Sequence, residues 1–211
     1  QISLAVTTLF WGAGATLQFI VLKWAESALG MTLSEGAILQ AVVAFGVAGG
    51  AVWAAWKVPL KKSLSVLKYG VIMGALVMLM AIFRKDLLPH IDISFGIFEM
   101  PLYLLVAYIF LMTIGWMSGY FVVPMNALLQ HRGHVLLSAG HSIAVQNFNE
   151  NLSVLAMLCI YSLLIWLNVP VTIVILIFGS CVCLLMLKII SWHERNQSEY
   201  DSLHLIGEQK H

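Results

Sequence analysis

The chain has 211 residues, of which 61% are hydrophobic and only 10% are charged. Soluble domains carry about a quarter charged residues, so lipid must solvate much of this apolar surface. The formal net charge of +1 gives no reason to expect nucleic acid as a partner. The composition therefore predicts an all-α membrane protein and excludes an ordinary soluble enzyme or a nucleic-acid-binding domain.

Six apolar segments recur along the chain, each close to the roughly 20 residues that cross a bilayer. They cover residues 2–24, 37–56, 64–83, 102–129, 139–167 and 169–190. We expect residues 1–192 to form a six-transmembrane-helix bundle and residues 193–211 to form a polar cytoplasmic tail. Because the chain starts with Gln1 and enters an apolar segment almost at once, we also expect the natural polypeptide to begin earlier.

The lysines and arginines divide unequally between the two sets of helix ends. Three lie on one side, namely Lys23, Arg84 and Lys85. Eight lie on the other: Lys57, Lys61, Lys62, Lys68, Arg132, Lys188, Arg195 and Lys210. Since cytoplasmic loops carry the excess of basic residues, the larger group predicts that both termini of this segment are cytoplasmic.

Two pairs of glycines predict close helix packing. Gly46 and Gly50 are four residues apart in the second segment, and Gly115 and Gly119 repeat that spacing in the fourth. Small residues at this spacing let two membrane helices approach each other closely. Pro124, further along the fourth segment, predicts a kink.

The fifth segment carries an unusual run of polar residues inside an apolar span. Of the ten acidic residues, only Glu150 lies well inside such a span, and its neighbours are Gln146, Asn147, Asn149 and Asn151. A charged side chain at the bilayer centre costs about 2.5–3.5 kcal/mol on insertion scales. This polar arc therefore predicts either a water-filled substrate or ion path, or a hydrogen-bonded cluster that holds helices together.

Other polar and aromatic residues in the spans carry weaker signals. Gln18 and Asn126 are candidates for the same path. The tryptophans, Trp11 among them, are expected to anchor helix ends at the membrane interface. Three cysteines and a histidine pair fit neither a disulfide framework nor a zinc site, so no metal and no cofactor is expected.

An intramembrane serine protease is the enzyme that a six-helix chain most readily suggests. Its nucleophile would be Ser118 in a Gly-x-Ser-Gly helix, but Trp116 replaces the first glycine. The nearest histidine, His141, opens the next helix, and nothing places it within hydrogen-bond reach of Ser118. The sequence therefore predicts that the chain is not an enzyme.

Two stretches, 120–133 (YFVVPMNALLQHRG) and 139–151 (AGHSIAVQNFNEN), resemble the bacterial lysophospholipid transporter family of the LplT type. Shorter matches at 9–15 and 159–163 agree, and the resemblance covers about residues 1–192. It corresponds to helices seven to twelve of that family, which is the C-terminal half of a major facilitator superfamily fold.

The resemblance implies a function in lipid transport in the bacterial inner membrane. It implies that lysophospholipids such as lysophosphatidylethanolamine move to the cytoplasmic side by alternating access and are re-acylated there by a partner acyltransferase. The missing N-terminal six-helix half would supply the other cavity wall, while membrane lipids surround the bundle. On this interpretation Gln18, Asn126, Gln146, Asn147, Asn149, Glu150 and Asn151 line the substrate or ion pathway.

Two other functions remain open at this stage. One is export of another amphiphile or a drug by a major facilitator protein. The other, from a different class, is a non-transporting six-helix scaffold subunit. An upstream reading frame for six more helices, with an acyltransferase gene beside it, would favour the lipid transporter.

Overall fold

Six long helices make up most of the chain. A computed structural model describes residues 2–89, 91–95, 98–136 and 139–199. In that part of the chain six helical segments are long and apolar enough to cross a membrane, the third of them, Leu60–Met80, only when the 3-10 helix that precedes Leu67 is included. The helices are α1 (Ile2–Trp24), α2 (Leu33–Lys57), α3 (Leu67–Met80), α4 (Leu102–Leu136), α5 (Ala139–Trp166) and α6 (Val171–Glu199). The predicted all-α, six-span bundle is confirmed.

Short irregular elements join the long helices. A π-helical turn, Ala25–Leu29, follows α1 and ends at Gly30, whose φ of 68° is readily adopted by glycine. A 3-10 helix, Leu60–Val66, leads into α3, and a second one spans Lys85–Leu87. Strands β1 (Asp92–Phe95) and β2 (Phe98–Pro101) then pair as an antiparallel hairpin before α4.

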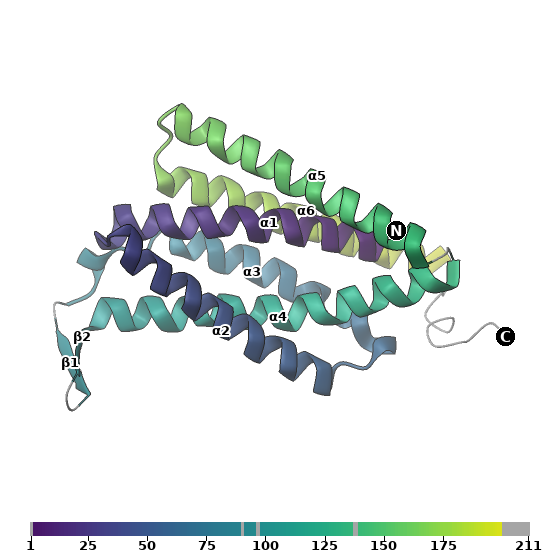
Figure 1. The fold of residues 1–211 in the computed structure, drawn as a ribbon, viewed down its shortest axis with the longest axis horizontal. Helices are drawn as coiled ribbons and strands as arrows, with labels where there is room; N and C mark the ends of the chain where they lie inside the picture. The colour runs from purple at the N-terminus through teal and green to yellow at the C-terminus, as the bar shows by residue number, and fades with distance from the viewer. Residues whose placement is uncertain (1, 90, 96–97, 137–138, 200–211) are drawn as a thin grey trace.

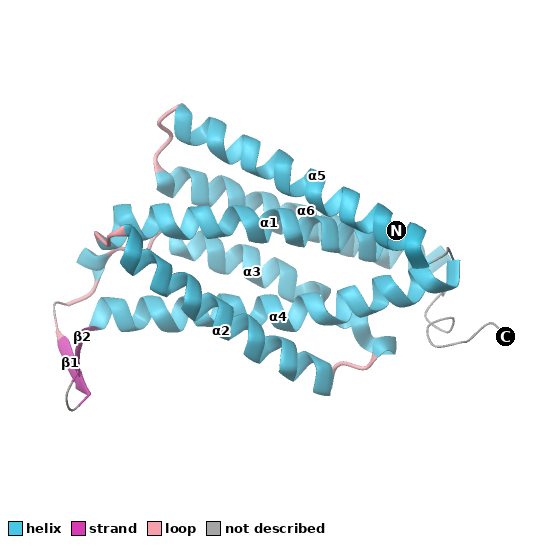
Figure 2. Ribbon diagram, viewed as in Figure 1, coloured by secondary structure: helices cyan, strands magenta, loops and turns pink. Residues whose placement is uncertain are grey.

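The helices associate in pairs that are not neighbours in sequence. The packed pairs are α2 with α4, α3 with α6, and α1 with α5. Figure 1 shows the N-terminus and the C-terminal end of α6 at one end of the bundle, and the β-hairpin at the other. Figure 2 shows that loops and strands are confined to these two ends. The helices thus alternate in direction, and among the described residues the larger and smaller sets of basic residues lie at opposite ends.

Two clusters of buried apolar side chains hold the bundle together. The first, around Trp24, Leu39 and Ile175, lies toward the hairpin end. The second, around Val6, Phe121 and Met186, lies toward the end that carries the termini. Because lipid is as apolar as these side chains, van der Waals fit rather than expulsion of water stabilises such contacts.

The two predicted glycine pairs pack against each other at the α2–α4 seam. A Cβ added at Gly50 would overlap the backbone carbonyl of Trp116, and one at Gly119 would overlap that of Val47. Gly46 and Gly115 are equally crowded by backbone atoms of the facing helix. The spacing of four therefore marks a close contact between two helices, as the sequence predicts.

Two helices, α4 and α6, extend beyond the ends that hydropathy predicts. The structure extends α4 to Leu136, and Figure 1 shows its last part turning toward the start of α5, beyond the predicted kink at Pro124. It also continues α6 to Glu199, into the segment expected as a polar tail. Hydropathy limits what lies in lipid, but polar residues can continue a helix in water. Residues 200–211 lie outside the described chain.

Two neighbouring glycines allow a matched test of the α2–α4 seam. In the full-length protein Gly50→Ala should destabilise the fold by about 1–3 kcal/mol, because the new methyl group overlaps a backbone that cannot move aside. At Gly49 a Cβ would meet only the Trp116 ring, 3.6 Å away, so Gly49→Ala should be nearly neutral. Denaturant unfolding in detergent measures both. Equal stability of the two variants would contradict the seam.

Candidate functional site

The polar arc lies on α5, the most peripheral helix of the bundle. Two serines attach the ends of the arc to other helices: Ser153 lies against Gly12 of α1, and Ser142 lies against Gly133 of α4. In both cases the glycine leaves the space that the serine occupies. Gln146 and Asn149 fall between these serines on the same helical stripe and are partly exposed.

Three of the four side-chain amides of the arc donate hydrogen bonds within α5 itself. The Nε2 of Gln146 donates to Oε1 of Glu150 over 2.8 Å. The Nδ2 atoms of Asn149 and Asn151 donate to the backbone carbonyls of Val145 and Asn147, also over 2.8 Å. The hydrogen bonds that these amides make within the described chain therefore connect α5 to no other helix. This pattern favours a lining role over an adhesive cluster.

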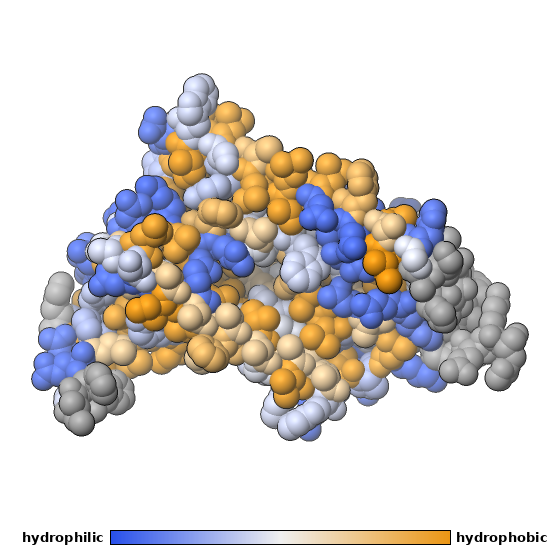
Figure 3. Space-filling model, in the orientation of Figure 1, coloured by the Kyte–Doolittle hydropathy of each residue, from blue (hydrophilic) through white to orange (hydrophobic). Residues whose placement is uncertain are grey.

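Much of the arc is open on the surface of this bundle. Asn147 and Asn151 are exposed, and Glu150 is partly exposed. Figure 3 shows hydrophilic side chains gathered over the α5 side of the face, beside a central hollow with mostly apolar walls. Backbone or side-chain polar groups in hydrocarbon without partners are costly, so this face must meet water, cargo or more protein.

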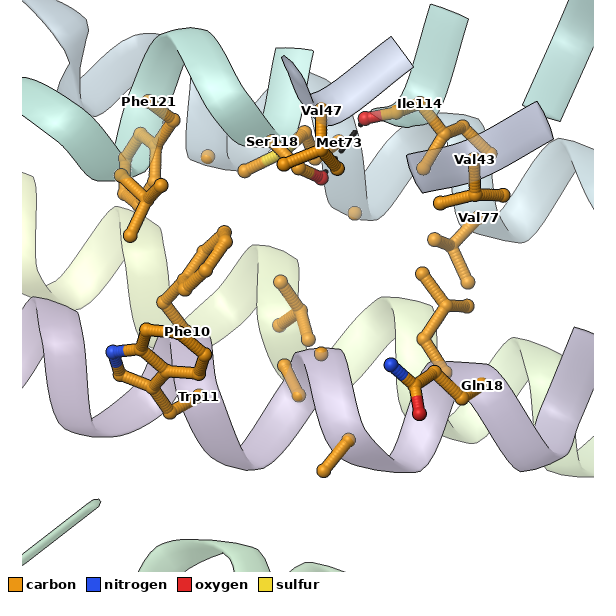
Figure 4. A pocket seen from close by; sticks show the side chains of 18 of the residues that line it. Phe10, Trp11, Gln18, Val43, Val47, Met73, Val77, Ile114, Ser118 and Phe121 are labelled. Carbon is orange, nitrogen blue, oxygen red and sulfur yellow. Dashed lines mark hydrogen bonds between the residues drawn. The ribbon is translucent and has the colours of Figure 1, made fainter. Parts of the chain in front are cut away.

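The hollow is a cavity of about 500 Å³ enclosed mainly by α1, α2, α3, α4 and α6. Its walls are mostly aliphatic and aromatic, and Figure 4 shows Phe10, Trp11 and Gln18 facing the α4 residues Ser118 and Phe121 across it. The rings of Phe10 and Phe121 have centroids 5.8 Å apart. A cavity of this size and polarity suits an apolar group such as an alkyl chain.

Polar groups occur at a few places on the cavity wall. Gln18, Gln40 and Ser118 contribute side chains. The Nε2 of Gln40 donates to the backbone carbonyl of Gln18 over 2.7 Å and so joins α2 to α1. Ser118 Oγ donates to the Ile114 carbonyl of its own helix over 2.9 Å and also lies within 3.4 Å of the Met73 sulfur of α3. These groups can orient a polar part of a ligand without making the cavity hydrophilic.

The structure places six of the seven predicted path residues in two adjacent regions. Gln18 is on the cavity wall, whereas the α5 residues of the arc are not. α5 reaches the cavity through Val154, which stands four residues beyond Glu150, about 6 Å along the helix axis. The carboxylate thus lies one turn from the apolar wall, and the two regions can serve the two ends of one amphiphile.

Asn126, on α4, belongs neither to the cavity wall nor to the polar arc of α5. Its Oδ1 atom is buried and has no hydrogen-bond partner in the described part of the chain. It stands seven residues before Gly133, on the stripe of α4 that turns toward Ser142 of α5. An unpaired buried amide oxygen is costly, so a ligand, water or another part of the full protein is a natural partner.

Two features of α1 differ from what the sequence predicts. They are the place of Trp11 and the hydrogen bond from Gln40 of α2 to the Gln18 carbonyl. Trp11 lies in the middle of α1 and lines the cavity instead of anchoring a helix end. The aromatic neighbours Phe10 and Phe121 were not anticipated either. The glycines beside Trp11 could have indicated close packing here, because Gly12 and Gly14 have no side chain on the helix surface. Ser153 occupies the space at Gly12. Among described residues no group of three His, Cys, Asp or Glu could hold a metal ion.

Comparison with known proteins finds relatives that are similar to this chain in sequence and share one name. The chain is 40% identical over 197 residues to the Lysophospholipid transporter LplT of Shigella boydii serotype 4 (strain Sb227). It is 39% identical over the same length to proteins of that name from Escherichia coli (strain K12) and Shigella sonnei (strain Ss046). Each match covers 93% of this chain but 45% of the relative, so the chain spans about half of their length.

These relatives are homologues named as transporters, not as enzymes, and the resemblance found in the sequence is confirmed. No family model matches the chain. No solved structure matches it either.

Proposed function

We propose that this chain is the C-terminal half of a lysophospholipid transporter. In this proposal the half carries lysophospholipids, such as lysophosphatidylethanolamine, across the bacterial inner membrane together with an N-terminal six-helix half. The observation that carries the proposal is the adjacency of a carboxylate-bearing polar arc on α5 to an apolar cavity of about 500 Å³. The printed names of the relatives and their length support it.

The chemistry of a lysolipid matches these two regions. A lysolipid has one polar headgroup and a single acyl chain, so it needs a polar track and an apolar space at the same time. Glu150, held by Gln146, can attract an ammonium headgroup, and the open amide oxygens beside it can accept hydrogen bonds. The acyl chain can then lie along the aliphatic walls beyond Val154.

Alternating access is the transport mechanism that we propose. The N-terminal half would cover the open face of the bundle and close the path between the two halves. Rocking of one half against the other would expose Glu150 to one side of the membrane and then to the other. The lysolipid would reach the cytoplasmic side, where a partner acyltransferase would restore its second chain.

Replacing the carboxylate tests this function directly. Glu150→Gln in the full-length protein should reduce uptake of labelled lysophosphatidylethanolamine into spheroplasts by about tenfold, because it removes the charge that attracts the headgroup while keeping the shape. Glu99→Gln makes the same change on the exposed hairpin strand and should leave uptake unchanged. Immunoblotting of membranes checks that both variants insert. Full uptake by Glu150→Gln would contradict a role for the carboxylate.

The alternative functions give different results in the same assay. A drug exporter would move members of a drug panel but not the labelled lysolipid, and a scaffold subunit would move neither. Either result with the unmodified full-length protein would contradict the proposed cargo.

Both termini of this segment are proposed to be cytoplasmic, on the unequal distribution of basic residues. In a full-length variant without Cys159, Cys181 and Cys183, a cysteine at Lys62 should react with a membrane-impermeant maleimide only after the cytoplasmic side is opened. A cysteine at Lys85, at the opposite end, should react in intact spheroplasts. The reverse pattern would contradict the orientation.

A further inference from the structure

Four exposed lysines gather where α2 passes into α3, a region that the proposed transport path does not use. They are Lys57 at the end of α2, Lys61 and Lys62 in the 3-10 helix, and Lys68 in the first turn of α3. We call this group the lysine corner. It lies at one end of two membrane-spanning segments, which is the level of lipid headgroups.

The lysine corner carries positive charge that the described protein does not balance. Among the residues that the structure describes, no carboxylate oxygen lies within ion-pair distance of these four ammonium groups, whereas Lys23 pairs with Glu26 over 2.8 Å. Asp86, Asp92 and Glu99 lie at the other end of the bundle, and Glu194, near the C-terminal end of α6, makes no ion pair with these lysines. The corner is therefore a local excess of cations.

Aromatic rings lie directly beneath two of these lysines. Lys57 Nζ is 5.7 Å from the centroid of the Trp53 ring, and Lys68 Nζ is 5.5 Å from that of Tyr69. The indole of Trp56 is 78% exposed. Tryptophan and tyrosine rings favour the headgroup level of a bilayer, so they locate the corner at the interface and not out in water.

From Lys68 an aromatic column descends into the span. Tyr69 contacts Tyr120 with centroids 5.2 Å apart, and Tyr120 stacks on Trp116 at 5.3 Å with an angle of 11° between the planes. Trp116 itself is 37% exposed. The column offers a continuous apolar surface below the charged groups, against which an acyl chain can lie.

We propose that the lysine corner binds the headgroup of an acidic phospholipid from the surrounding leaflet. The lysine ammonium groups donate to its phosphate, and one of its acyl chains follows Tyr69, Tyr120 and Trp116. A lipid is favoured over a soluble anion because the aromatic column continues from the charge into the hydrocarbon. This lipid is not the transported cargo, and the inference stands whatever the cargo is.

The test compares phosphatidylglycerol with phosphatidylcholine of identical acyl chains. Each lipid is titrated into the detergent-solubilised full-length protein, and native mass spectrometry gives the dissociation constants. The unmodified protein should prefer phosphatidylglycerol. Lys61→Gln/Lys62→Gln should weaken phosphatidylglycerol binding by about fivefold for each lysine, while phosphatidylcholine binding stays constant.

A second pair of basic residues provides the matched control. Arg84→Gln/Lys85→Gln removes two charges at the opposite end of the bundle and should keep the preference. Lys61→Arg/Lys62→Arg should keep it as well, because the charges remain. An unchanged preference in Lys61→Gln/Lys62→Gln, or an equal loss in the two glutamine double variants, would overturn the proposal. So would binding of inorganic phosphate as tight as that of the lipid.

Discussion

The constraint on which the rest depends is that hydrocarbon cannot solvate the polar side of α5. A carboxylate and four amides occupy six consecutive positions, 146–151, of which only Phe148 is apolar. Three of the four amides, Gln146, Asn149 and Asn151, donate to groups of their own helix, so these hydrogen bonds do not join the arc to neighbouring helices. Such a face is stable in a membrane only if water, cargo or another protein surface covers it. The open side of the bundle, which carries this arc, is therefore the side that water, cargo or another protein surface must cover.

Close packing elsewhere makes that open side possible. The paired glycines bring the backbones of α2 and α4 into contact, and α3 packs against α6. These contacts leave space between α1 and the α2–α4 pair, and the cavity occupies it. α5 is joined to the bundle chiefly along α1, through Ser153 at Gly12 and through the Tyr161 hydroxyl, which donates to the Phe19 carbonyl over 3.4 Å. The polar arc is thus carried by a helix that packs chiefly on α1, beside the apolar wall of the cavity.

The sequence predicted those features that follow from local composition. Six spans, the polar arc and the glycine seam all follow from hydropathy and spacing, which depend on residues near one another in the chain. The cavity depends on contacts between segments that are distant in the chain, so hydropathy and spacing could not predict it. The same is true of the aromatic group of Phe10, Trp11 and Phe121 and of the hydrogen bond from Gln40 to Gln18. The same limit explains why Gln18 and Glu150, which look alike as polar groups in apolar spans, lie in different regions. Helix ends were also uncertain, because α6 continues into polar sequence that hydropathy assigns to a tail.

The central claim, that the polar arc faces a water-filled path, is tested most directly by the chemical accessibility of α5. The measurement labels single cysteines with a water-soluble maleimide, in a full-length variant that lacks Cys159, Cys181 and Cys183. Cysteines at Asn147 and Asn151 should react and be protected by added lysophosphatidylethanolamine. Cysteines at Ile160 and Leu163, which are exposed on the apolar part of the same helix, should not react. No reaction at Asn147 and Asn151, or equal reaction at all four positions, would contradict the account.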